Sequence, residues 1–433
     1  MQQRFSTKSY FLSIIAFLLL GPVWTSAQQN KIDTLTLTIN QADSIFLQKN
    51  LTLLANEYNV DLSKALVQQA RVWDNPVLNT DQNIYDGKFF RHKTENGLQY
   101  GQVYIQVQQL IRTAGKIKKL TRLAEDNVLN AEAQFNEVMR NLKFLLTTNL
   151  NNLAQLQNVA SIYQAELQSL ETLVKGMDEM LKMGDISLKE NTRIKALLFS
   201  IQNDYADNLR QQIDLQKEIG LLLQSGDTVW IVANVGQSLT IQQLNDLSLA
   251  GLQDSALLYR PDMALTKNIS LFQQHNIAYQ KALAKPDYSI GLEYDKLNSY
   301  VPNYYGLAVS VPLPLFNRNK GSIAAAEFAF KQNEVVVQQV QNQVAKEVSG
   351  AWQKLKITTA LINNDNNLLR NSYDELMKNM ISSYRERQVG LIEFIDFLAT
   401  YKETRIKQWQ LVTAQRNAAA ELNHVINQNV IKL

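Results

Sequence analysis

The sequence predicts an α+β fold in which very long helical hairpins alternate with pairs of β-strands. All seven prolines of the 433-residue chain lie outside residues 77–260 and 315–433. Because proline interrupts helices, these two proline-free stretches permit unusually long ones. Short segments in which apolar and polar residues alternate predict strands. The same order of segments occurs twice, which indicates a duplicated unit.

The composition excludes several classes of protein and site. The absence of cysteine rules out disulfides, thiolate metal sites, a cysteine nucleophile and a lipid-modified cysteine. The chain has 43 lysines and arginines against 40 acidic residues, a net charge of +3. This excess is too small to predict a polyanion-binding surface, so we expect no nucleic-acid partner.

The first 27 residues have the features of a secretory signal peptide. Arg4 and Lys8 precede an apolar run at 10–20, and small residues follow at 25–27. The run is short for a bilayer-spanning anchor, which needs about 20 apolar residues, although an uncleaved anchor is the alternative. We expect a mature chain that begins near Gln28 and has no later membrane-spanning helix.

The rest of the chain is predicted to consist of two structural repeats, residues 28–250 and 251–433. Pro76 and Pro286 lie 210 positions apart, and Gly184 and Gly390 lie 206 apart. The two spacings differ by only four residues over more than a hundred positions, which is typical of a duplicated domain. The predicted parts are a strand pair at about 76–110, a helical hairpin at about 114–224, a β connector at about 226–240, a second strand pair at about 286–313 and a second hairpin at about 320–428.

Three of the four predicted strands alternate clearly between apolar and polar residues. Their apolar positions are Val103, Ile105 and Val107, then Tyr288, Ile290, Leu292 and Tyr294, then Tyr305, Leu307, Val309 and Val311. The segment from Val77 to Tyr85 fits less well. This pattern suits a membrane barrel strand, but a half-buried soluble hairpin has the same pattern and is favoured from the strands alone. Four strands also cannot close a barrel, which needs about eight.

The helical tracts carry heptad seams. In the tract at about 116–182 the seam residues are Tyr163, Leu167, Leu170, Val174, Met177 and Leu181, and in the tract at about 322–387 they are Leu369, Tyr373, Leu376 and Met380. Helices of this length would extend roughly 100 Å. After Gly184 and Gly390 the chain is predicted to turn back into helices of about 40 residues. Each such helix, stacked on a shorter one such as residues 41–73, would match one long helix. The remaining faces are rich in asparagine and glutamine, and they either meet bulk solvent or line water inside a tube.

The junction between strand and helix in the second repeat carries a resemblance to a known family. It reads Val-Pro-Leu-Pro-Leu-Phe-Asn-Arg-Asn-Lys-Gly at 311–321 and is supported by Arg-Pro-Asp at 260–262 and Asn-Pro at 75–76. With these motifs and its duplication, the chain resembles the TolC-type outer-membrane factors of bacterial tripartite export systems. Within that family it is most similar to the heavy-metal branch typified by CzcC and CusC.

The resemblance implies an α+β membrane protein that forms a homotrimer. Each protomer would give four strands to one twelve-stranded barrel in outer-membrane lipid, and long helical hairpins to an α-barrel crossing the periplasm. The connector and the chain termini would form a belt around the middle. Such a channel conducts passively, and its energy comes from an inner-membrane pump of the RND type, coupled through a periplasmic adaptor.

The resemblance also implies where the adaptor would dock. The family makes this contact at the periplasmic turns of its helical hairpins, which here contain Gly184 and Asp185 in one turn and Val389, Gly390 and Leu391 in the other. Glycine at such a turn permits the left-handed backbone conformation, and both glycines are expected to adopt it.

A periplasmic gate is implied at Asp396, six residues after the second turn glycine. Three copies of one carboxylate around a threefold axis would form an acidic ring that attracts cations. The sequence departs from the family pattern at Ile392 and Ala399, where the prototype has an arginine and a second aspartate. Glu393 is therefore a second candidate for the ring.

The sequence predicts no enzyme, cofactor or metal site. His92, His275 and His424 are scattered, without the spacing of metal ligands, and no phosphate-binding loop or nucleophile elbow is present. The leading hypothesis is an export duct, with heavy-metal cations as one possible substrate class. The same duct could serve drug efflux or type I protein secretion. An alternative of another class is a secreted coiled-coil scaffold of the cell envelope.

Overall fold

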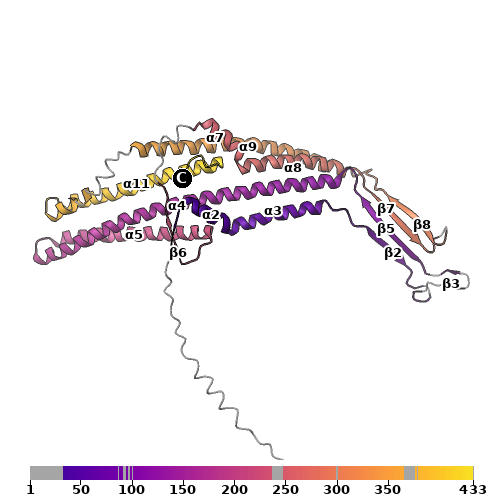
Figure 1. The fold of residues 1–433 in the computed structure, drawn as a ribbon, viewed down its shortest axis with the longest axis horizontal. Coiled ribbons are helices and arrows are strands. Elements are labelled where there is room, and N and C mark those ends of the chain that lie inside the picture. Colours follow the sequence, from indigo (N-terminus) through magenta and orange to yellow (C-terminus); the bar gives the residue numbers. More distant parts are fainter. Residues whose placement is uncertain are drawn as a thin grey trace, which may run out of the picture.

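The computed structural model describes residues 33–432 apart from 86, 91–93, 96–97, 100, 237–246, 299–300, 365–375 and 378. The expected signal peptide, His92, Leu369 and Tyr373 lie outside the described residues. The molecule is an elongated helical body with a β-sheet at one end and the helix reversals at the other (Figure 1). Short helices and strands surround its middle.

One antiparallel sheet of four strands brings the two predicted repeats together. Its order is β2–β5–β7–β8, with bounds Val77–Gln82, Val103–Ile111, Tyr288–Asp295 and Tyr304–Ser310. The first two strands come from the first repeat and the last two from the second. Because β2 and β8 each pair on one side only, the sheet has two open edges. A separate short hairpin, β3 (Thr94–Glu95) and β4 (Leu98–Gln99), lies between β2 and β5 in the chain.

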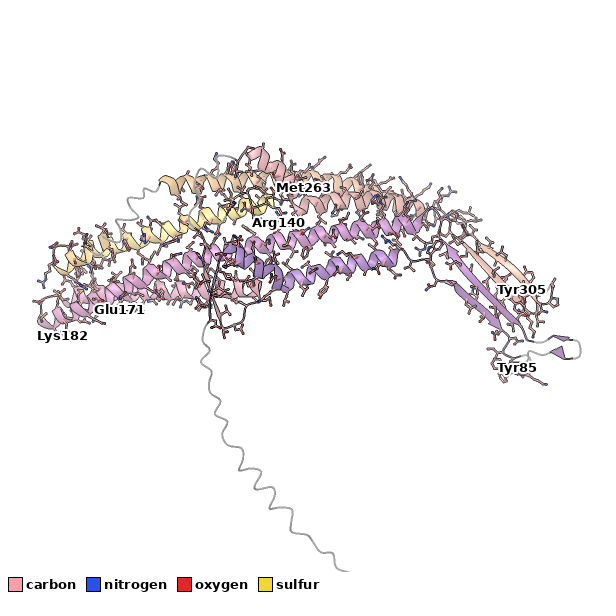
Figure 2. The ribbon with its side chains drawn as sticks, viewed as in Figure 1. Tyr85, Arg140, Glu171, Lys182, Met263 and Tyr305 are labelled. Carbon is pink, nitrogen blue, oxygen red and sulfur yellow. The ribbon has the colours of Figure 1, made fainter. Side chains whose placement is uncertain are left out.

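The pairing register separates the sheet into an apolar face and a polar face. One row across the apolar face consists of Leu78, Val107, Leu292 and Leu307. These four side chains are 50–70% exposed. The adjacent row on this face consists of Thr80, Ile105, Tyr294 and Tyr305, and Tyr305 is labelled in Figure 2. A single protomer therefore leaves an apolar sheet face uncovered.

The helical body is built around two very long helices. Helix α4 (Lys116–Met183) has 68 residues, about 100 Å of helix, and α9 (Lys320–Asn364) is described over 45 residues. Two returning helices, α5 (Leu188–Leu223) and α11 (Leu391–Ile426), have 36 residues each. At the sheet end, helices pack in the order α3 (Leu51–Ala70), α4, α8 (Pro261–Leu283) and α9, which repeats the order of the strands. At the other end α4 packs against both α5 and α11.

Hydrogen bonds join the short helices end to end. In the first repeat, the side chain of Asn50 at the start of α3 donates to the carbonyl of Leu222 at the end of α5, at 2.9 Å. In the second repeat, the guanidinium of Arg260 at the start of α8 donates to the carbonyl of Val425 near the end of α11, at 3.2 Å. Asn50 and Arg260 lie 210 positions apart, the same spacing as Pro76 and Pro286.

The helix predicted at 41–73 is interrupted at Asn50, and this differs from the sequence prediction. The structure has α2 (Ile39–Lys49) and α3 in its place. Asn50 has an extended backbone, and its side-chain oxygen accepts from the amide of Leu53, so it caps α3. The second repeat has the same break, because α7 (Leu249–Tyr259) ends at Arg260, where Pro261 starts α8.

A short parallel strand pair lies at the middle of the body. Strand β1 (Asp33–Leu37) pairs with β6 (Val229–Ala233), which lies within the predicted connector. Residues 237–240 of that connector are outside the described residues. Ile231 of β6 is fully buried, and its backbone bonds to Gln157 of α4 and Gln216 of α5. Beyond the strand, the carbonyl of Gly236 accepts from Arg416 of α11 at 2.7 Å, which ties the connector to the second repeat.

The first heptad seam is confirmed by burial. Tyr163, Leu170 and Met177 are buried, and they pack with Phe394 and Leu398 of α11 in one apolar cluster. In the second tract, Leu376 was expected to be a seam residue but is 45% exposed, and its neighbour Met377 is buried at 8%. The core contact at this turn therefore falls one residue later than the heptad count places it.

No helix in the described part of the chain is both long enough and apolar enough to cross a membrane.

Candidate functional site

The first helix reversal lies at Gly184. The residue ends α4 with φ of 79°, in the left-handed region, as the sequence predicts. The amides of Gly184 and Asp185 donate to the carbonyls of Leu181 and Met180, so the last turn of α4 is closed by a Schellman motif. Ser187 then caps α5 in a capping box with Glu190.

The second reversal corrects the predicted role of Gly390. Its φ is −75° and ψ is 154°, an extended conformation, and it lies at the N-cap of α11. The left-handed residue is Arg387, with φ of 57°, whose amide donates to the carbonyl of Tyr384. Gly184 therefore corresponds to Arg387, and Ser187 to Gly390. Both pairs lie 203 positions apart, so matching glycine to glycine misaligned the two turns by three residues.

The two turns lie against each other and enclose a cavity of about 580 Å³. Arg387 of one turn donates to the carbonyl of Asp185 in the other at 3.1 Å. Four of the five predicted docking residues line the cavity, together with Met177 and Met180 of α4; they are Asp185, Val389, Gly390 and Leu391. Gly184 does not line it. The reversals thus form one tip with a shared hollow, and Lys182 in Figure 2 marks its position.

Tyr384 lines the tip cavity and packs against a second aromatic ring. The rings of Tyr384 and Phe394 stack with centroids 4.5 Å apart. The hydroxyl of Tyr384 lies 4.0 Å from the sulfur of Met177. Burial raises the pKa of Tyr384 above its ordinary value, with Glu190 adding to the effect. These contacts connect the first turn of α11 to α4 and to the residues that precede the second reversal.

The predicted gate residues lie on α11 just beyond the tip. Glu393 and Asp396 are three residues apart on the helix, and both are exposed in the single protomer. Phe394 and Leu398 of the same helix point into the apolar cluster. Glu393 and Asp396 therefore occupy a face that no part of the described protomer covers, where a carboxylate is free to meet water or ions.

A pair of alanine substitutions tests the assignment of the two turns. Gly184→Ala is expected to lower the free energy of unfolding by about 1 kcal/mol, because a Cβ is disfavoured at positive φ. Gly390→Ala is the matched control and should change it by less than about 0.5 kcal/mol. No atom lies within 4 Å of a Cβ at either position, so only the backbone conformation distinguishes them. Urea unfolding in detergent measures both, and an equal loss would contradict the assignment.

The polar face of the sheet is a second candidate surface, and sequence reasoning did not single it out. Glu293 accepts hydrogen bonds from Tyr104 at 2.9 Å and from Gln106 at 3.1 Å, and Asp295 accepts from Gln102 at 2.6 Å. Gly306 lies directly opposite Glu293, where a larger side chain would meet Tyr304 and that carboxylate. The alternation within each strand could have indicated this face, because the polar positions of neighbouring strands fall in the same rows.

A cavity of about 540 Å³ lies at the middle of the body, between α2, α4 and the end of α11. Its buried arginine, Arg140, is paired with Glu137 at 2.6 Å and donates to the carbonyl of His424. Burial, assisted by the charge of Arg140, lowers the pKa of His424 to about 4, so this histidine is neutral at physiological pH. Its ring stacks on Phe144. The charges of this cavity are largely matched within the protein.

The histidines do not form a metal centre in the described part of the chain. His275 pairs with the single carboxylate of Asp126 at 2.6 Å, and His424 packs as described above. Among the described residues, no three potential metal ligands lie close enough together to hold an ion.

Comparison with solved structures shows the fold of the chain. CusC, in a structure concerned with folding and transmembrane channel formation, superposes with a TM-score of 0.71 at 18% identity, over 90% of this chain and 92% of that one. The CmeC outer membrane channel of Campylobacter jejuni gives 0.72 at 12% identity, over 90% and 85%. The outer membrane protein VceC of Vibrio cholerae gives 0.70 at 15% identity, over 91% and 97%.

Sequence comparison adds a match to one family model over part of the chain. Comparison with curated protein sequences found no match. Residues 44–223, which contain α3, α4, α5 and the first strand pair, match the family model described as "Outer membrane efflux protein". The chain thus matches this family model over part of its sequence, and it shares the fold of solved outer membrane channels over nine-tenths of its length.

Proposed function

We propose that this protein is the outer-membrane duct of a tripartite export system and conducts its substrate passively. The observation that carries the proposal is the uncovered apolar face of the sheet. Its central row is 50–70% exposed in one protomer, yet consists of leucine and valine. Soluble proteins cover such a surface, whereas a barrel strand presents it to lipid and turns its polar side to an aqueous lumen.

Three copies of the chain would close this sheet into one barrel. The open edges β2 and β8 supply the hydrogen-bonding groups, and three sheets of four strands exceed the minimum of about eight. The edge helix α3 also has an exposed apolar face that a neighbouring copy could cover. Five of its large apolar side chains recur at helical spacing and are 42–63% exposed, namely Leu51, Leu54, Tyr58, Leu62 and Leu66. On the other edge, α9 exposes Phe328 and Val335, which an adjacent α3 would cover.

The tip is the proposed meeting point with a periplasmic adaptor, which would couple the duct to an inner-membrane pump of the RND type. Its cavity is lined by residues from both reversals and is large enough to take several side chains of a partner. The exported substrate follows from the pump. The strand-to-helix junction at 311–321 resembles that of the heavy-metal branch, so heavy-metal cations are one substrate class, beside drugs or secreted proteins. A secreted scaffold would not require the exposed apolar sheet face.

Conductance in a planar lipid bilayer tests the duct. The purified protein in detergent is expected to insert and produce discrete conductance steps. A protein that remains a water-soluble monomer without detergent would end this proposal and favour the scaffold.

The gate is tested on the same channel by Asp396→Ala. Three exposed carboxylates near the axis should bind multivalent cations, so the variant is expected to lose most of the block by trivalent ions while still forming trimers. Asp214→Ala is the control, because its carboxylate lies on α5 and is 75% exposed away from the tip. Block that is unchanged in Asp396→Ala would remove this residue from the constriction.

A further inference from the structure

A buried carboxylate lies in the seam between the first helical hairpin and α11. Glu166 of α4 is 3% exposed and lies on the buried stripe that also contains Tyr163 and Leu170. Neither of its carboxylate oxygens has a hydrogen-bond partner among the described residues. Burying a carboxylate in this way is costly when it is charged, and a simple packing role would be served equally well by an apolar residue.

Charged groups from both neighbouring helices surround Glu166. On α11, Lys402 attracts the carboxylate; on α5, Asp204 repels it. These two groups pair with each other at 2.7 Å, so the lysine is already engaged. On α11 Arg405 follows Lys402 by one turn, and on α4 the Tyr163 hydroxyl is a further titratable group that the Glu166 carboxylate influences. Glu166 thus lies beside an ion pair that bridges α5 and α11, without belonging to it.

Burial raises the pKa of Glu166 from 4.5 to about 7, with Lys402 opposing the rise and Asp204 adding to it. At the pH of a bacterial envelope, the closed seam therefore holds this carboxyl group in both protonation states. The neutral form fits the apolar cluster. The ionised form has no hydrogen bonds there. Its desolvation cost disappears when α11 moves away from α4 and water reaches the carboxylate.

We propose that Glu166 is a proton-dependent lock between α4 and α11, which holds the seam closed when protonated and releases α11 when ionised. The same helix α11 carries Glu393 and Asp396 in its first two turns, so release of the seam would move the proposed constriction. That consequence rests on the proposed duct function, but the lock itself is a property of the helix packing.

The direction of the pH effect follows from linkage. The closed seam raises the pKa of Glu166, so it binds the proton more tightly than the open seam does. The contribution of Glu166 to closing is therefore full below about pH 4.5. It falls as the pH rises from there to about 7, and above about 7 it is lost. The difference between the two limits is on the order of a hundredfold in the closing equilibrium.

Amide hydrogen exchange in residues 391–406 measures this equilibrium without any use of the channel. The full-length protein in detergent is examined from pH 4.5 to 8.5, with rates corrected for the chemical effect of pH. The wild type is expected to lose protection by on the order of a hundredfold across this range. Glu166→Gln should remain protected throughout. Glu171→Gln, an exposed position on the same helix (Figure 2), should behave as the wild type.

Two further variants keep Glu166 itself in place. Asp204→Asn removes the repelling charge and should shift the midpoint to lower pH, and Lys402→Met should shift it to higher pH. A wild-type pH profile in Glu166→Gln, or midpoints that do not move in these directions, would overturn the lock. If hydrogen exchange shows the expected pH profile but the bilayer shows no conductance, the lock is supported and only the duct function is contradicted.

Discussion

Leu292→Arg is expected to keep the protein out of the bilayer. Leu292 lies at the centre of the apolar row, between Val107 and Leu307, and is 70% exposed. An arginine facing lipid near the middle of a bilayer costs about 2–4 kcal/mol, and a closed ring of copies would repeat this cost in every protomer. The fraction of protein that becomes protease-resistant in lipid vesicles measures the effect.

The control for this experiment uses the other face of the same sheet. Gln108 lies on the polar face, in the row of Gly291, so Gln108→Arg introduces the same charge on the side proposed to face water. It should insert as the wild type does. Equal insertion of Leu292→Arg and Gln108→Arg would contradict the proposed orientation of the sheet.

Arg260→Ala is expected to have the largest effect on the stability of the helical body. Arg260 is 2% exposed and is paired with Asp262 and with Glu347 of α9, both at 2.6 Å. It also bonds to the carbonyl of Val425, so one side chain joins α8, α9 and α11. Removing one partner of a buried ion pair costs about 3–5 kcal/mol, because Asp262 and Glu347 lose the counter-charge paired with them. Thermal unfolding in detergent measures the loss.

The pH dependence of stability distinguishes this ion pair from simple packing. Burial alone would raise the pKa of Asp262, but its bonds to Arg260 hold that pKa below the ordinary value. The pair therefore stabilises the protein at neutral pH, and this contribution is lost as the pH falls through the lowered pKa. Arg260→Ala should lack this acid-dependent loss.

Lys354→Ala is the control for burial. It removes a 63% exposed partner of Glu421 and should lower the free energy of unfolding by less than about 1 kcal/mol. Similar losses in both variants would contradict the role of burial.

The sequence predicted the elements of the fold because they depend on local rules. The end of α4 and the strands of the second repeat follow from proline placement, heptad spacing and alternation, and the left-handed Gly184 follows from its lack of a Cβ. The break at Asn50 was missed because asparagine is also tolerated inside a helix; its cap on the amide of Leu53 is a local signal, whereas its bond to Leu222 is tertiary.

The tip shows where sequence reasoning fails for the site. Gly390 was aligned with Gly184 by residue type, but the backbone places Arg387 in the left-handed conformation instead. Arginine there is tolerated because its side chain reaches Asp185 in the other turn, a contact between residues about 200 positions apart in the sequence. Glu166 was missed for a similar reason. Glu166 is buried because α11 packs on α4. In the sequence of α4 alone, nothing distinguishes it from the other carboxylates of that helix.

The central claim is that the open edges of the sheet close against other copies of the chain. Because the chain has no cysteine, introduced cysteines are the only thiols. Leu78→Cys on β2 is combined in turn with Tyr305→Cys, Leu307→Cys or Val309→Cys on β8, and the protein is oxidised in lipid vesicles. The account predicts that at least one pair links copies into covalent dimers and trimers. Oxidised protein that remains monomeric for every pair would contradict a barrel closed between β2 and β8.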